Sequence, residues 1–226
     1  MHIEPGVVDG AKLVLSYATA VGAFGLAAHM ARDSIRNNGG IGPLALRSLM
    51  TTVLVFCFFE VLPHHPVGVS EVHLILGSTL LLLFGAGASA IGLAMGLLLQ
   101  GVFFAPFDLP QYGMNVTTLL VPLWAISLLA KRILPEGTAY VDTRYTQALA
   151  LSTAYQGGIV AWVAFWALYG HGFTTENLVS IGSFGVAYMS VILVEPLIDL
   201  GVLAAAKAMA RFSQGPLFNR RLHQPA

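Results

Sequence analysis

The sequence predicts an all-α fold, a polytopic membrane bundle of about seven transmembrane helices. Of the 226 residues, 56% are hydrophobic and only 10% are charged, whereas soluble domains carry about a quarter charged residues. Several stretches reach the roughly 20 apolar residues that a membrane-spanning helix needs. The alternation of a barrel strand is absent, and an open sheet is excluded because its edges would remain unsatisfied in lipid.

Most of the expected spans are single apolar stretches of crossing length. The exception is 72–105, which is too long for one helix and is interrupted by the small residues of 85–89. We therefore divide it into two short spans joined by a tight turn. No linker, low-complexity tract or internal repeat divides the chain, so 1–226 is expected to be one domain. The expected spans are 11–31, 44–62, 72–86, 88–105, 113–130, 145–169 and 178–198.

The basic residues predict the orientation of these spans. They follow the first and fifth spans and the last one, at Arg32, Arg36, Arg47, Lys131, Arg132, Arg144, Lys207, Arg211, Arg220 and Arg221. The segments without any are 1–10, 63–71, 105–112 and 170–177. The positive-inside rule then predicts an external N-terminus and a cytoplasmic C-terminus, in agreement with seven spans. No basic region precedes the first span, so we expect no cleavable signal peptide.

Composition and motifs exclude several classes of function. Eleven basic and eleven acidic residues cancel, so no basic field favours a nucleic-acid partner. The single cysteine, Cys57, excludes an intrachain disulfide. The chain lacks a P-loop, a G-x-S-x-G elbow, an H-E-x-x-H pair and any zinc-type or haem-type cysteine spacing. We therefore expect no enzyme activity, and any ATP-driven step requires a separate ATPase subunit.

A histidine at the second position of a chain can chelate a metal together with the chain terminus. The amine of Met1, the backbone nitrogen of His2 and its imidazole Nδ1 close two fused chelate rings. The three nitrogens share a plane and leave a fourth position open, which favours nickel(II) or copper(II) and is also accepted by cobalt. His73, at the external start of the third span, is the candidate fourth ligand. The alternative interpretation is that such a histidine is a bystander.

Other polar residues lie in or beside the spans. Ionisable groups inside a membrane are functional candidates, but near helix ends they reach water, and we favour this alternative for Glu60, Glu71, Glu195 and Asp199. Uncharged groups are expected to form interhelical hydrogen bonds or to position a metal-binding loop, and these are Gln100, Asn115 and Thr117.

Four segments resemble a known family. They are MHI with Gly6, VGVSEVHLILG (67–77), LLLQGVFFAPFDLPQYGMNV (97–116) and VEPLI (194–198). In this order they are similar to the CbiM/NikM proteins, the substrate-specific membrane subunits of energy-coupling-factor transporters for cobalt and nickel. The chain departs from the family pattern at Pro5, Thr118 and Tyr188, where an acidic residue, an asparagine and a histidine are usual.

The resemblance implies a cobalt or nickel site formed by the amine of Met1, the amide and imidazole of His2 and the imidazole of His73. The possible supporting residues are Asn115, Gln100, Glu71 and His65. No tightly bound cofactor is implied, because Co²⁺ or Ni²⁺ is the transported substrate.

The resemblance also implies partners and a location. The partners are a coupling-type transmembrane permease subunit and cytoplasmic ATPases, in the cytoplasmic (inner) membrane of a bacterium or archaeon. The leading hypothesis is therefore the substrate-binding subunit of an ATP-driven importer. The altered supporting positions favour an alternative, a non-transporting CbiM-like accessory or structural subunit of a larger membrane complex. Genes for a permease and ATPases beside this one would support the first hypothesis.

Overall fold

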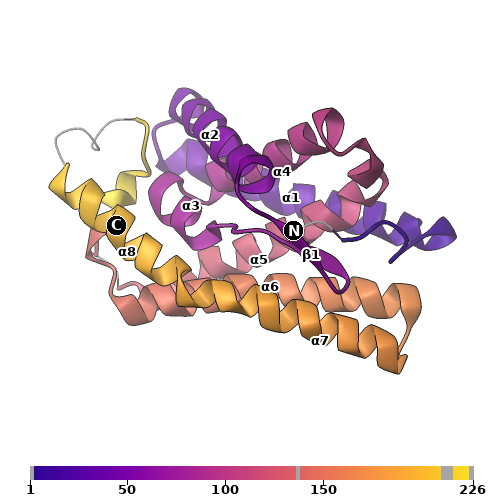
Figure 1. The fold of residues 1–226 in the computed structure, drawn as a ribbon. Coiled ribbons are helices and arrows are strands. Elements are labelled where there is room, and N and C mark those ends of the chain that lie inside the picture. Colours follow the sequence, from indigo (N-terminus) through magenta and orange to yellow (C-terminus); the bar gives the residue numbers. More distant parts are fainter. Residues whose placement is uncertain (1–2, 136–137, 210–215, 224–226) are drawn as a thin grey trace.

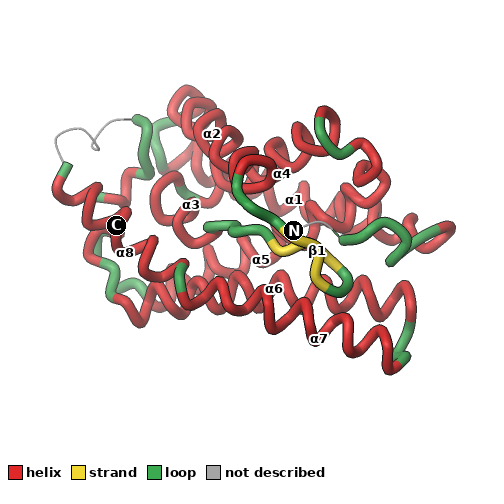
Figure 2. The backbone as a smooth tube through the Cα atoms, viewed as in Figure 1, coloured by secondary structure: helices red, strands yellow, loops and turns green. Residues whose placement is uncertain are grey.

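The computed structural model describes residues 3–135, 138–209 and 216–223. Helices dominate these residues (Figures 1 and 2). They are α1 (Leu13–Asn37), α2 (Ile41–Phe56), α3 (Gly77–Phe84), α4 (Ala86–Phe103), α5 (Tyr112–Ile133), α6 (Tyr145–His171), α7 (Thr175–Met189) and α8 (Glu195–Ala208). Two short strands, β1 (His65–Val67) and β2 (Ser70–Val72), form an antiparallel hairpin. Six helical segments of the described residues are long and apolar enough to cross a membrane, which confirms the predicted helical membrane bundle.

Helix α4 packs against α1, α2 and α5. A Cβ atom at Gly92 would lie 2.3 Å from Thr51 Oγ1 of α2, so only a glycine permits this approach of the two helices. The Thr51 hydroxyl also donates to Ala88 O of α4 at 2.8 Å. Small residues and interhelical hydrogen bonds of this kind hold membrane helices together, since lipid supplies no hydrophobic driving force between them.

The stretch 72–86 is not a transmembrane helix, and that prediction is wrong. Val72 belongs to strand β2, residues 73–76 form neither helix nor strand, and α3 begins only at Gly77. With eight residues, α3 rises only about 12 Å, less than half of a bilayer core. The predicted break is confirmed, because Gly85 has a left-handed φ of 83° and α4 begins directly after it.

Tertiary contacts explain why this stretch is not helical. Pairing with β1 keeps the backbone extended as far as Val72. Further on, the side chain of Gln156 on α6 donates from Nε2 to Ile75 O at 3.0 Å. Irregular backbone is tolerated at membrane depth only where protein groups satisfy it. The segment therefore passes through the bundle as irregular backbone followed by a short helix.

The last span is interrupted as well. Helix α7 is followed by a 3-10 turn, Ser190–Leu193, and then by α8. Pro196 lies in the first turn of α8, where a backbone N–H would have no partner within the helix, so proline costs no hydrogen bond there. The combined segment Thr175–Ala208 has 34 residues and extends beyond the predicted span 178–198. Figure 1 shows α7 and α8 following one another past α6.

Cysteine labelling tests the expected orientation. In a Cys57→Ser background, Pro66 on the hairpin and Thr146 at the start of α6 are exposed positions for a new thiol. A membrane-impermeant maleimide is expected to modify Pro66→Cys in intact cells, and Thr146→Cys only after permeabilisation, because basic residues cluster on the Thr146 side. The opposite pattern would invert the orientation.

Candidate metal centre

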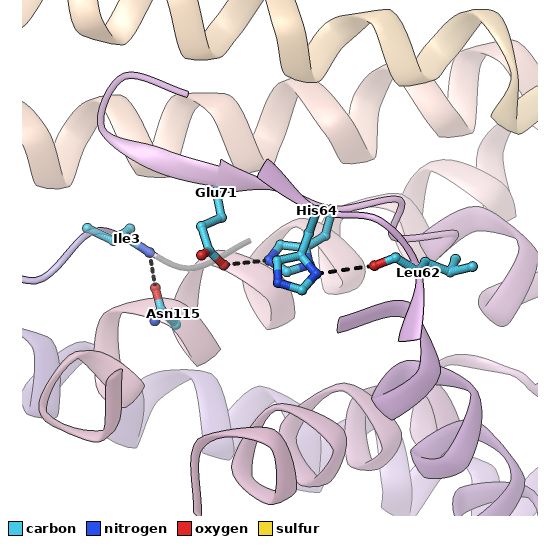
Figure 3. A network of polar contacts seen from close by, with 6 residues as sticks. Ile3, Leu62, His64, Glu71 and Asn115 are labelled. Atoms are coloured by element: carbon cyan, nitrogen blue, oxygen red, sulfur yellow. Dashed lines mark hydrogen bonds and ion pairs between the residues drawn. The ribbon is translucent and has the colours of Figure 1, made fainter. Parts of the chain in front are cut away.

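The N-terminal segment is fixed between the hairpin and α5. Ile3 forms an isolated antiparallel bridge with Ser70 of β2. Its backbone N donates to Asn115 Oδ1 of α5 at 3.0 Å (Figure 3). The next backbone N, that of Glu4, donates to Val69 O at 3.2 Å. Asn115 therefore positions the chain immediately after His2, while Met1 and His2 themselves lie outside the described residues.

Contacts with the end of α6 secure the rest of this segment. The His171 ring contacts Gly6 O at 3.1 Å through Nε2, and Lys12 Nζ donates to Gly170 O at 2.7 Å. A Cβ atom at Gly170 would lie 1.7 Å from Val7 O, so this approach requires glycine. Gly6 itself has φ 93°, a conformation that side-chain-bearing residues rarely adopt. The segment thus folds back onto the bundle.

His73 is buried directly after the hairpin, with a side chain that is 0% exposed. Its Nε2 lies 3.0 Å from Glu71 Oε2. The Phe59 and His73 rings pack edge to face with a centroid distance of 5.2 Å. A carboxylate that accepts from one ring nitrogen of a histidine fixes the tautomer and makes the other nitrogen a better metal ligand. The lone pair of such a His73 would lie on Nδ1.

His64, not His65, lies beside His73. Because His65 pairs with Val72, the antiparallel register places residue 64 opposite residue 73. The His64 and His73 rings stack at a centroid distance of 4.8 Å. His64 Nδ1 contacts Leu62 O at 3.2 Å (Figure 3). His65 is exposed, so the structure does not bring this expected supporting residue to the site. A two-residue hairpin turn at Gly68 and Val69 was the sequence signal that would have favoured His64.

Acidic side chains also gather here. Glu4 and Asp108 both interact electrostatically with Glu71. Burial and the negative charge of Glu71 raise the pKa of Glu4 above its usual value. Clustered acidic side chains attract cations, so this arrangement favours a positively charged ligand.

The other polar candidates divide into two groups. Thr117 Oγ1 on α5 lies 3.1 Å from Thr19 Oγ1 on α1, which confirms an interhelical contact. Gln100 is buried, and its Oε1 has no hydrogen-bond partner among the described residues.

Two acidic residues expected to reach water do not. Glu195 and Asp199 are both 0% exposed. The break before α8 turns them toward α3 and α6, where hydroxyl and amide groups bind them. The prediction failed because it treated the last span as one straight helix ending near these residues.

Comparison with known proteins matches residues 2–212 to the family model CbiM, described as "Cobalt uptake substrate-specific transmembrane region". The chain belongs to the CbiM family. A CbiM chain is a membrane component of cobalt uptake, and this one is a multi-pass membrane protein. No curated protein and no solved structure gave a significant match.

Within the residues that the structure describes, no group of three or more His, Cys, Asp or Glu side chains is placed to hold a metal. A metal at His73 therefore requires ligands of another kind or from the N-terminal residues outside that part of the chain. The amine and the amide nitrogen of the terminus are ligands of another kind.

Proposed function

We propose that this CbiM chain binds Co²⁺ or Ni²⁺ on the external side of the membrane and delivers it inward. The ligands are the amine of Met1, the amide and imidazole nitrogens of His2, and the imidazole of His73. This hypothesis requires Met1 to carry a free amine. The chain would act as the substrate-binding subunit of an energy-coupling-factor importer.

The anchoring of Ile3 is the observation that carries the proposal. Ile3 follows His2 directly and pairs with Ser70, three residues before His73. Asn115 holds the same residue from α5 at 3.0 Å. Two segments far apart in the sequence, each with a candidate ligand, are therefore joined by backbone hydrogen bonding beside the Glu71–His73 pair.

The described residues suggest how the site operates. Metal displaces protons from the terminal amine, the amide and the imidazoles, so binding releases protons. Glu71 orients the His73 ring, and Glu4 lies near enough to interact electrostatically with Glu71. Release toward the cytoplasm needs a state with lower metal affinity, and a ligand or partner must favour that state. Since the sequence has no P-loop, a coupling permease with two ATPases would supply this energy.

Metal analysis of the purified protein tests the proposal. The wild-type chain, with its native N-terminus, is expected to retain cobalt or nickel in equimolar amount after desalting. His2→Ala is expected to retain almost none, because it loses one ligand and the six-membered chelate ring. The control is His223→Ala, a histidine near the opposite end of the chain. Absence of metal from the correctly processed wild-type protein would favour the alternative, a non-transporting accessory subunit.

A further inference from the structure

The start of α8 carries two acidic side chains that the proposed metal centre does not use. Glu195 is the first residue of α8 and Asp199 follows it by four positions, so both lie on one face of the helix. Both are fully buried. Helices α3 and α6 pack against α8 (Figure 1). The pair therefore lies inside the membrane-spanning bundle.

Hydroxyl and amide groups of α3 and α6 donate hydrogen bonds to this pair. Oε2 of Glu195 accepts from Ser152 Oγ at 2.5 Å and from Gln156 Nε2 at 2.7 Å. Oδ1 of Asp199 accepts from Thr79 Oγ1. Each carboxyl group thus has its own donor, and a further side chain lies between the two.

Ser78 is the side chain between the two carboxyl groups. Its Oγ lies 3.1 Å from Glu195 Oε1 and 2.7 Å from Asp199 Oδ2. A serine hydroxyl carries a single hydrogen, whereas an ionised carboxylate only accepts. Ser78 can donate its one hydrogen fully to only one carboxylate, and a proton on the other carboxyl group would complete both contacts. The backbone N–H of Ser78 also donates to Glu195 Oε1 at 3.4 Å.

The pair has no cationic partner among the residues that the structure describes. Within the described ranges, neither carboxylate forms an ion pair with Lys, Arg or His, and Lys207 of the same helix pairs with Asp142 at 2.6 Å. Two buried negative charges without a counter-charge are strongly unfavourable. A proton reduces that charge.

The titratable groups facing the pair are tyrosines. The hydroxyls of Tyr155 on α6 and Tyr188 on α7 interact electrostatically with Glu195. Helix α3 and the 3-10 turn before α8 contain no titratable side chain. The short 3-10 helix Tyr140–Asp142 also packs against α8. Its Asp142 forms an ion pair with Lys207 of α8.

Buried oxygens without a hydrogen-bond partner lie beside the pair in the described part of the chain, and one of them, Gln156 Oε1, can only accept. Gln156 Oε1 and the hydroxyls of Tyr155 and Tyr188 are buried and have no hydrogen-bond partner in the part of the chain that the structure describes. Gln156 is directed at the pair, since its Nε2 binds Glu195. A buried acceptor without a donor is costly. An ionised carboxylate has no hydrogen to offer, whereas a protonated carboxyl group does.

We propose that Glu195 and Asp199 form a proton-binding site inside the bundle and hold one proton between them through Ser78. The proton keeps the start of α8 bound to α3. Its loss leaves two like charges one helical turn apart, which favours separation of α8 from α3. The site contains none of the proposed metal ligands, so it is tested separately from the metal centre.

Infrared spectroscopy of the metal-free protein in lipid nanodiscs tests this site. A protonated carboxyl group has a C=O stretch well separated from that of a carboxylate. At neutral pH the wild-type protein is expected to show a carboxylic acid band that is lost in the double variant Glu195→Gln/Asp199→Asn. Glu176→Gln, which removes an exposed carboxylate of α7, should leave the band unchanged. An acid band of equal intensity in the wild type and the folded double variant would overturn the proposal.

Isotope labelling keeps the test valid if the double variant does not fold. In the wild-type protein, carbon-labelled aspartate or glutamate should shift the acid band, and Ser78→Ala should change its frequency, because the bridging hydroxyl is lost. The matched control is Ser89→Ala, whose buried hydroxyl donates to Gly85 O within its own helix turn. A band that neither label shifts, or that Ser78→Ala leaves at the wild-type frequency, would refute a shared proton.

Discussion

A tag of several residues added before Met1 is expected to abolish high-affinity cobalt and nickel binding. The extension converts the terminal amine, a proposed ligand, into an amide and removes the five-membered chelate ring. The loss should exceed the roughly 10–100-fold in affinity that follows removal of an outer-shell partner of a metal ligand. The measurement is calorimetric titration of the purified protein with each metal.

The control is an extension of the same size at the C-terminus, which leaves the amine free and should leave affinity unchanged. Circular dichroism should show equal helicity in both extended proteins, because Ile3 keeps its backbone bonds to the hairpin and to Asn115. Undiminished binding by the N-terminally extended protein would refute the chelate and leave His73 as a ligand of some other site.

Replacing His73 with alanine is expected to lower metal affinity about as strongly, because it removes the ligand from the second segment. His65→Ala is the matched control, since His65 lies eight positions earlier on the same hairpin but is exposed. His64→Ala should cause a smaller loss than His73→Ala, because it removes a ring stacked on the ligand and not the ligand itself. The losses in His2→Ala and His73→Ala should be far from additive, since residues of one site couple strongly.

The same titrations at several pH values give a second readout. Protons compete with metal for the terminal amine and both imidazoles, so wild-type affinity should fall as the pH drops below about 7. In His73→Ala the dependence should be shallower, because one competing imidazole is gone. If His73→Ala binds metal with wild-type affinity and His64→Ala does not, the ligand is His64 and not His73.

Hydropathy alone predicted most of the helices. Long apolar stretches such as 145–169 became continuous helices, because a helix satisfies its own backbone within the segment whatever surrounds it in lipid. The failure at 72–86 has the opposite cause. There, the hairpin and the Gln156 side chain satisfy the backbone, and no local pattern reports a partner more than 80 residues away.

For the candidate metal site, the sequence by itself determined which candidate ligands the chain carries, His2 and His73, and their positions. It also showed that the chain has no P-loop. Only the tertiary structure decided which groups meet. It joined Ile3 to Ser70, stacked His64 on His73 and left His65 exposed, because hairpin register selects the opposing residue.

The interior of the bundle shows the same division. In the sequence, Glu195 and Asp199 are four positions apart, which is about one turn of a helix. Their burial depended on the break before α8 and on hydroxyls from α3 and α6, which are distant in sequence. Helix formation is local and can be read from hydropathy, whereas the partners of a buried polar group are set by which helices pack together.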